Sequence, residues 1–181
     1  MTMMWAPGAQ AGEAPVPVSA TARVDLRPAT GKIELAVPIV EQRPERCGPA
    51  ALAMVLRFHG GTSQQVALAD SAYDPALRGA LITDLAACAR RAGFDARVER
   101  MNEDSLLTLL GRGLPPVLLY RRGIGPLSPQ HYGVLVGWDP ERGRWILHDG
   151  ARTPHRMSRR ELAARWAAAG SEALVVRPVG P

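Results

Sequence analysis

The sequence predicts an α+β fold in which N-terminal helices pack against a C-terminal antiparallel sheet. Segments with helical composition and capping residues come first along the chain, and most segments with strand composition follow them. This segregation is typical of helices packed on one antiparallel sheet. With 181 residues, of which 46% are apolar, the chain can bury a single core and requires no second domain.

Three helices are expected in the first half of the chain. The first covers residues 49–59, because a proline suits the first helical turn and an Ala- and Leu-rich run follows it. Threonine or serine at 62–63 caps a second helix that runs toward residue 72. A third helix is capped by Thr83 and ends at Gly93.

The second half is expected to contain strands and two further helices. The strands are expected where short runs are rich in apolar residues. The expected order is a strand over residues 94–98, a helix over 102–110, a strand over 117–120, a hairpin over 131–149, a helix over 158–168 and a strand over 173–176.

The predicted hairpin brings two polar residues together. A turn rich in Asp, Pro and Gly separates its two apolar runs. If Trp138 pairs with Arg144 across a five-residue loop, Gly133 lies opposite Asp149. His131 and Asp149 are then diagonal neighbours on one face, roughly 7–8 Å apart at the backbone. A hydrogen bond between the imidazole and the carboxylate is therefore expected.

Cys47 directly precedes the first predicted helix. Unpaired backbone N–H groups and the helix dipole favour a thiolate at that position, and the thiolate is the species that attacks a carbonyl carbon. A single cysteine is most often a small buried hydrophobe, and Cys88, in the middle of a predicted helix, is interpreted in that way. Gln42 lies five residues before Cys47, so its amide could donate to an oxyanion beside the sulfur.

Four residues together supply the groups of a cysteine-hydrolase site. Cys47 supplies a nucleophile, His131 a base for its proton, Asp149 a carboxylate that fixes the imidazole tautomer, and Gln42 an amide for the oxyanion. This combination favours nucleophilic catalysis over a structural role for the cysteine.

Two stretches of the chain resemble a known family. They are Val37-Pro38-Ile39-Val40-Glu41-Gln42 with Cys47-Gly48-Pro49-Ala50-Ala51-Leu52-Ala53-Met54-Val55-Leu56 and Phe58-His59-Gly60, and then His131-Tyr132-Gly133-Val134-Leu135-Val136-Gly137. They are similar to the papain-like, bacteriocin-processing (double-glycine) cysteine peptidases, best known as the N-terminal domain of peptide-exporting ABC transporters. The resemblance runs from about residue 37 to residue 176 and is strongest around Cys47 and His131.

The resemblance implies a papain-like cysteine peptidase domain over residues 37–178. It implies that Cys47 is the nucleophile, His131 the general base, Asp149 the orienting partner of His131, and Gln42 part of the oxyanion hole. In transporter-borne members the glutamine usually stands six residues before the cysteine, and an Asp-Pro pair follows the hairpin. Here the spacing is five and glycine follows Asp149, a spacing similar to that of the stand-alone relatives.

These residues predict a cysteine peptidase that hydrolyses peptide bonds in a peptide or protein substrate. A thiol acyl- or peptidyl-transferase would use the same residues, because the triad does not encode the acceptor. A catalytically idle, peptide-binding relative is the third interpretation. No cofactor is implied, and no metal, because strand alternation places His148 on the face opposite Asp149 and leaves too few convergent ligands with His155.

The net charge of +5 reflects arginine clusters that include residues 121–122 and 156–165. These clusters alternate with acidic residues and lack interleaved aromatic residues, so they predict a solvated face and no nucleic-acid partner. No segment approaches the roughly 18 to 20 continuous apolar residues of a membrane span. We therefore expect a stand-alone enzyme without the transporter and without an integral membrane segment.

Residues 1–36 are expected to form a flexible N-terminal segment, because they are low in charge and rich in Ala, Pro and Gly. Ala9-Gln10-Ala11 resembles the cleavage site of a secretory signal, although no basic region or adequate apolar run precedes it. Either this segment is the remnant of a signal peptide, or the resemblance is chance. We expect export, to the periplasm or as a secreted protein, with the cytoplasm as the alternative.

Overall fold

The computed structural model of the protein describes residues 31–123, 125 and 127–180, and this part has the predicted α+β fold. Its helices are α1 (Cys47–Phe58), α2 (Ser63–Ala67), the 3-10 helix η1 (Leu68–Ala72), α3 (Ile82–Arg91), α4 (Glu103–Gly111) and α5 (Arg159–Ala167). No helix in the described part is both long and apolar enough to cross a lipid bilayer.

The described strands form one antiparallel sheet. They are β1 (Ile33–Glu34), β2 (Phe94–Arg100), β3 (Val117–Arg121), β4 (Gln130–Asp139), β5 (Arg144–His148), β6 (His155–Ser158) and β7 (Glu172–Pro178). Their order is β2-β7-β3-β4-β5-β6, and β1 pairs with the part of β4 that extends beyond β3. Sequence neighbours β3, β4, β5 and β6 are therefore also neighbours in space.

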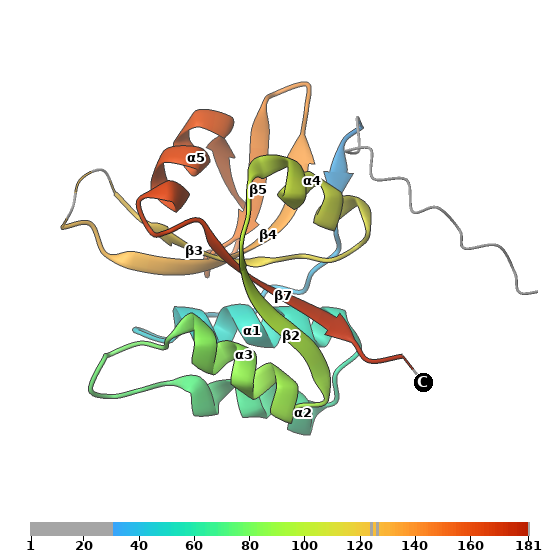
Figure 1. Cartoon of the computed structure of the whole chain (residues 1–181), viewed down its shortest axis with the longest axis vertical. Coiled ribbons are helices and arrows are strands. Elements are labelled where there is room, and N and C mark those ends of the chain that lie inside the picture. The colour runs from blue at the N-terminus through green and yellow to red at the C-terminus, as the bar shows by residue number, and fades with distance from the viewer. Residues whose placement is uncertain (1–30, 124, 126, 181) are drawn as a thin grey trace, which may run out of the picture.

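Two apolar cores use the two sets of alternating side chains of the sheet. Along β4, Val134 and Val136 belong to the core that contains α1 and α3, whereas Leu135 belongs to the core that contains α4 and α5. Figure 1 shows α1, α2 and α3 gathered at the bottom and β4, β5, α4 and α5 at the top, with β2 and β7 running between them. The sheet thus separates the helix that begins at Cys47 from α5.

The cap predicted at residues 62–63 is present in the structure, and two further helices have side-chain caps. The Thr62 side chain caps α2 in a capping box with Gln65, and the side chains of Asn102 and Ser158 cap α4 and α5. The prediction for Thr83 is wrong, because α3 already begins at Ile82 without a side-chain cap. That start places the Ile82 side chain in the core, where it is 7% exposed.

The short strands β1 and β6 are missing from the elements expected from sequence. β1 lies within the segment expected to be flexible, and β6 contains only four residues, of which one is buried. Such short strands are defined by their pairing partners, Trp138 for Ile33 and Leu147 for His155. Residues 1–30, with the signal-like Ala9-Gln10-Ala11 sequence, lie outside the described residues.

The predicted register of the β4–β5 hairpin is wrong at its turn and right at its open end. Trp138 pairs with Trp145 rather than with Arg144, so the loop is one residue shorter than expected. A β-bulge between Leu135 and Gly137 then shifts the register back by one residue. Beyond the bulge Val134 pairs with His148, which is the register that the sequence predicts for the neighbourhood of Asp149.

Gly137 allows β1 to approach β4 closely. A Cβ atom at this position would clash with the backbone carbonyl oxygen of Ile33 and lie 3.1 Å from Cα of Glu34. Gly137→Ala should therefore lower the free energy of unfolding by about 1–3 kcal/mol, because β1 must shift to make room. Thermal unfolding followed by circular dichroism measures this change. In the matched control Gly79→Ala, the new Cβ makes an ordinary 3.8 Å contact, and equal melting temperatures for the two variants would contradict the expectation.

Candidate active site

Cys47 is the first residue of α1 and is half-buried. Helix α1 therefore begins two residues earlier than Pro49, and the thiol belongs to the first turn. Gly48 allows this turn to pack tightly, because a Cβ there would lie 3.1 Å from the Tyr132 ring and 3.2 Å from Cβ of Ala80. The Tyr132 hydroxyl in turn donates to the carbonyl oxygen of Ala80 at 3.0 Å. The start of α1 is thus fixed against β4.

A cleft of about 850 Å³ opens beside this helix start. Its lining includes all four of the residues selected from sequence, Gln42, Cys47, His131 and Asp149. These come from the segment before α1, from α1 itself, from β4 and from the end of β5. The fold therefore brings together a thiol, an imidazole, a carboxyl-bearing residue and an amide that are up to 107 residues apart, the interval from 42 to 149.

The His131 ring is buried and firmly oriented. Its Nε2 atom lies 2.9 Å from the backbone carbonyl oxygen of Asp149, and the ring packs edge-to-face on Tyr120 with centroids 5.7 Å apart. Because a carbonyl oxygen only accepts, Nε2 carries the proton in this contact and Nδ1 remains free to act as a base. Burial lowers the pKa of His131, and the bond to the carbonyl opposes this shift only in part. The imidazole is therefore neutral at neutral pH.

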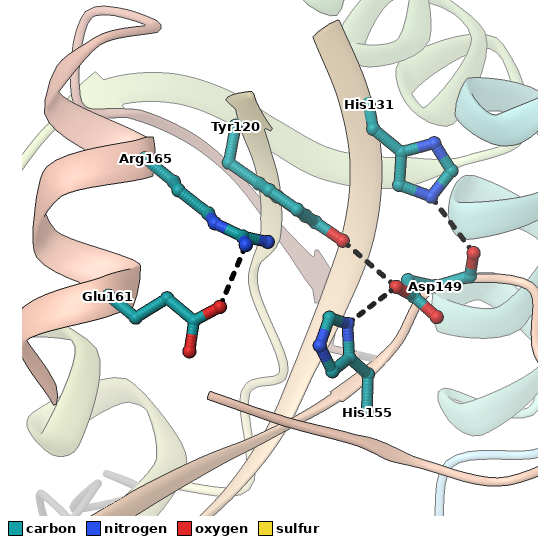
Figure 2. A network of polar contacts seen from close by, with 6 residues as sticks. All are labelled: Tyr120, His131, Asp149, His155, Glu161 and Arg165. Carbon is teal, nitrogen blue, oxygen red and sulfur yellow. Dashed lines mark hydrogen bonds and ion pairs between the residues drawn. The ribbon is translucent and has the colours of Figure 1, made fainter. Parts of the chain in front are cut away.

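The expected hydrogen bond between His131 and the carboxylate of Asp149 is replaced by this backbone contact. The carboxylate points elsewhere, as Figure 2 shows: its Oδ2 accepts from the Tyr120 hydroxyl at 3.2 Å and is 2.9 Å from Nδ1 of His155. The physical reason is competition, since two donors, one on β3 and one on β6, satisfy the buried carboxylate and leave the backbone oxygen for His131.

The Asp149 carboxylate is ionised at neutral pH although it is only 5% exposed. Burial raises its pKa, but the hydrogen bonds that the carboxylate accepts from His155 and Tyr120 outweigh burial, so the pKa is lowered overall. Burial and the adjacent carboxylate raise the pKa of Tyr120, which keeps its hydroxyl a donor. A negative charge therefore lies permanently beside the imidazole of His131.

Gln42 contacts the backbone of Asp149 and of Gly150. In the amide orientation that satisfies both groups, Nε2 donates to the carbonyl oxygen of Asp149 at 3.2 Å and the side-chain oxygen accepts from the Gly150 N–H at 3.2 Å. Gly150 has φ +95°, and a Cβ atom there would clash with the Gln42 side chain. One amide hydrogen of Gln42 remains available for another acceptor, because a primary amide has two.

The segment between Gln42 and Cys47 is anchored through Glu45. Glu45 has φ +65°, and its carboxylate accepts from the Tyr73 hydroxyl at 3.0 Å and from Nε of Arg78 at 2.7 Å. The Arg46 guanidinium lies 4.2 Å from the centre of the Tyr73 ring. These contacts tie the approach to α1 to the loop between η1 and α3, which forms one wall of the cleft.

Two residues that hold the Asp149 carboxylate are not predicted as partners of the site from sequence: Tyr120, and His155, which the sequence offers only as a metal ligand. Tyr120 lies opposite His131 in the β3–β4 pairing, and His155 enters the site because β6 returns alongside β5. The Gly, Thr and Pro residues between His148 and His155 are typical of a turn, but a turn alone does not specify that a strand pairing with β5 follows it.

Comparison with known proteins identifies the family of the chain. Residues 34–174 match the model of the Peptidase_C39 like family, which is most of the chain. The chain belongs to this family. The family resemblance found in the sequence is thereby confirmed, and family membership points to a cysteine peptidase. No curated protein sequence matches the chain.

Solved structures of C39 peptidase domains share the fold. A double glycine motif protease from an AMS/PCAT transporter, solved with its leader peptide, is 18% identical with a TM-score of 0.62, covering 84% of this chain and 98% of that one. A C39-like peptidase from Bacillus anthracis is 18% identical with a TM-score of 0.66, over 83% and 99% of the two chains. The peptidase domain of Streptococcus ComA, a bifunctional ABC transporter, is 23% identical with a TM-score of 0.56, over 81% and 99%.

The two thiols of this C39-like chain should differ sharply in reactivity. Cys47 lines the cleft, whereas Cys88 is 1% exposed and contacts Ser71 and Arg91. Iodoacetamide should therefore alkylate Cys47 and spare Cys88 in the folded protein, as peptide mass spectrometry will measure. In urea both thiols should react. Preferential alkylation of Cys88 in the folded protein would refute the assignment of Cys47 as the reactive thiol.

The network around Asp149 should stabilise the fold in a pH-dependent way. Because the folded-state pKa of Asp149 is lowered, its contribution is complete above the unfolded pKa of about 4 and is lost as the pH falls through the folded value. Asp149→Asn should lower the free energy of unfolding by about 1–3 kcal/mol at pH 7 and by less at about pH 3. Urea unfolding at the two pH values measures this, and an equal loss at both would contradict an ionised, hydrogen-bonded carboxylate.

Proposed function

We propose that the protein is a cysteine peptidase that hydrolyses peptide bonds in a peptide or protein substrate. The observation that supports this most is the single cleft that holds the Cys47 thiol at a helix start together with His131 and Gln42. A neutral imidazole with one free ring nitrogen, a permanent negative charge near it and an amide with a spare hydrogen meet the requirements of thiol-based acyl transfer.

The first step of the proposed reaction is attack on the scissile carbonyl. Nδ1 of His131 accepts the proton of the Cys47 thiol, and the sulfur forms a bond to the carbonyl carbon. The resulting imidazolium keeps its Nε2–H on the carbonyl oxygen of Asp149, at the 2.9 Å contact described above. Burial lowers the pKa of His131, and the charge of the Asp149 carboxylate opposes this shift and so favours the imidazolium.

The negative charge then moves to the carbonyl oxygen of the substrate. The free amide hydrogen of Gln42 is proposed to donate to this oxyanion, and the first-turn N–H groups of α1 add to the positive potential. The tetrahedral intermediate collapses when His131 gives its proton to the leaving amine. The carbon–nitrogen bond breaks, the new N-terminus departs, and a thioester joins the remaining acyl group to Cys47.

Water completes the cycle. His131, neutral again, accepts a proton from a water molecule that attacks the thioester, and the same oxyanion contact stabilises the second tetrahedral intermediate. Release of the carboxylic acid restores the Cys47 thiol. Each half-reaction therefore uses His131 once as base and once as acid.

The shape of the cleft favours an extended peptide with apolar side chains as the substrate. Leu77 and Leu81 are 55% and 52% exposed, and both lie on the cleft wall together with Leu119. Exposed leucines grouped at a concave site are typical of a binding surface. The transporter protease described above was solved with a leader peptide, which supports a peptide ligand for this fold.

Replacement of Gln42 and of His131 should separate two kinds of loss. On a peptide that the wild type cleaves in a peptide-library digest, His131→Ala should lower kcat/KM by several orders of magnitude. Gln42→Ala should lower kcat about 100- to 1000-fold with little change in KM, because the oxyanion contact strengthens only in the transition state. Stopped assays with mass-spectrometric product detection measure both.

Two controls sharpen this test. Gln64→Ala removes an exposed glutamine on α2 outside the cleft and should keep wild-type activity. Alkylation of Cys47 by iodoacetamide forms no oxyanion, so its rate should be unchanged in Gln42→Ala and reduced in His131→Ala. An unchanged kcat in Gln42→Ala would refute the oxyanion role. In water labelled with oxygen-18, the label should appear in the new carboxylate of the product. Cleavage without incorporation of the label would indicate acyl transfer instead of hydrolysis.

A further inference from the structure

A second cavity adjoins the cleft on the side of the Asp149 carboxylate. It has a volume of about 510 Å³, and its lining includes Arg122, His155, Arg156 and Arg165. We call this cavity the arginine pocket. Asp149 and Ala151 line the pocket as well, and together with Arg122 they also line the cleft. A ligand that occupies the cleft can therefore extend directly into the arginine pocket.

The fold gathers this positive charge from two arginine clusters that are distant in sequence. Arg122 follows β3, whereas Arg156 and Arg165 belong to β6 and α5. Nε of Arg121 donates to the carbonyl oxygen of Ala168 at 3.0 Å, which ties the end of β3 to the end of α5. Two clusters that the sequence predicts to form a solvated face thus meet beside the candidate active site.

The charges of the arginine pocket are only partly neutralised. The Asp149 carboxylate is already bonded to Tyr120 and His155, and Glu161 pairs with one terminal nitrogen of Arg165 at 2.8 Å (Figure 2). Nε of Arg165 is buried without a hydrogen-bond partner. Neither Arg122 nor Arg156 forms an ion pair with any residue that the structure describes. Unpaired guanidinium groups at the wall of a pocket attract an anion, and their planar donor fork matches a carboxylate.

We propose that the arginine pocket binds a carboxylate of the substrate peptide, on the leaving-group side of the scissile bond. The proposal rests on the peptidase function above, in which His131 protonates the leaving amine. The leaving part of the peptide must then start next to His131, and the lining shared through Arg122 and Asp149 leads from there into the arginine pocket. The carboxylate belongs either to an Asp or Glu side chain or to the C-terminus of the peptide.

The first experiment measures substrate preference. On a cleaved library peptide, Glu and Gln are compared at each position of the leaving part, and a free C-terminus is compared with an amidated one. The wild type should prefer the acidic form at one of these positions about 10- to 100-fold in kcat/KM, since a hydrogen bond to a charged group is involved. The position that responds identifies which of the two carboxylates binds.

Variants locate the preference in the arginine pocket. Arg122→Gln and Arg165→Gln should abolish it, whereas Arg160→Gln, the same charge change on an exposed residue of α5, should leave it intact. If Arg165→Gln does not fold, Arg165→Lys replaces it in the test. This variant keeps the charge but loses the planar fork, and it should retain part of the preference. Cleavage without any acidic preference, or a preference unchanged in Arg122→Gln, would overturn the proposal that the arginine pocket binds a carboxylate. The peptidase proposal would remain intact.

The second experiment does not depend on catalysis. In the full-length Cys47→Ala variant, succinate is titrated at constant ionic strength while the arginine Nε–H signals are followed by nuclear magnetic resonance. Saturable shifts confined to the arginines of the pocket, and lost in Arg122→Gln, are expected. Small uniform shifts of all surface arginines would overturn the proposal. If no peptide is cleaved, the peptidase function fails while this titration still decides whether the arginine pocket binds a carboxylate.

Discussion

The backbone carbonyl oxygen of Asp149 is the point on which the candidate active site depends. It accepts a hydrogen bond from Nε2 of His131 on β4 and another from the amide of Gln42. The proposed base and the proposed oxyanion donor are thereby held by one atom. That atom lies where it does because Gly150 turns the chain into the left-handed region directly after it. A displacement of this one peptide group would therefore move both side chains to which the proposed reaction assigns a role.

The side chain of the same residue fixes this peptide group in place. A carboxylate that is 5% exposed is costly unless donors surround it, and Tyr120 from β3 and His155 from β6 supply them. Strand β4, which bears His131, lies between β3 and β5 in the sheet. The network thus links the strands on either side of His131, so the sheet rather than a loop sets the orientation of its imidazole.

The main features of the fold and four members of the candidate site could be predicted from sequence because they depend on local patterns. The helix after Cys47 follows from composition, and the hairpin with His131 follows from alternation around a turn. The partners of the Asp149 carboxylate could not be found in this way. Tyr120 belongs to a strand whose own sequence does not specify which strand it pairs with. His155 belongs to a strand that is too short to show an alternation of apolar and polar residues. The positions of both residues beside Asp149 depend on strand pairing between segments that are distant in sequence.

The β-bulge between Leu135 and Gly137 has a consequence for how this enzyme scaffold can vary. It lies between the tip of the β4–β5 hairpin and the end that holds His131 and Asp149. The strand register on the catalytic side is set by the pairs below the bulge and by β3, not by the length of the tip. A change in the length of the tip therefore does not alter the register near His131 and Asp149. Insertions or exchanged loops at residues 140–143 should leave the geometry of the candidate site unchanged.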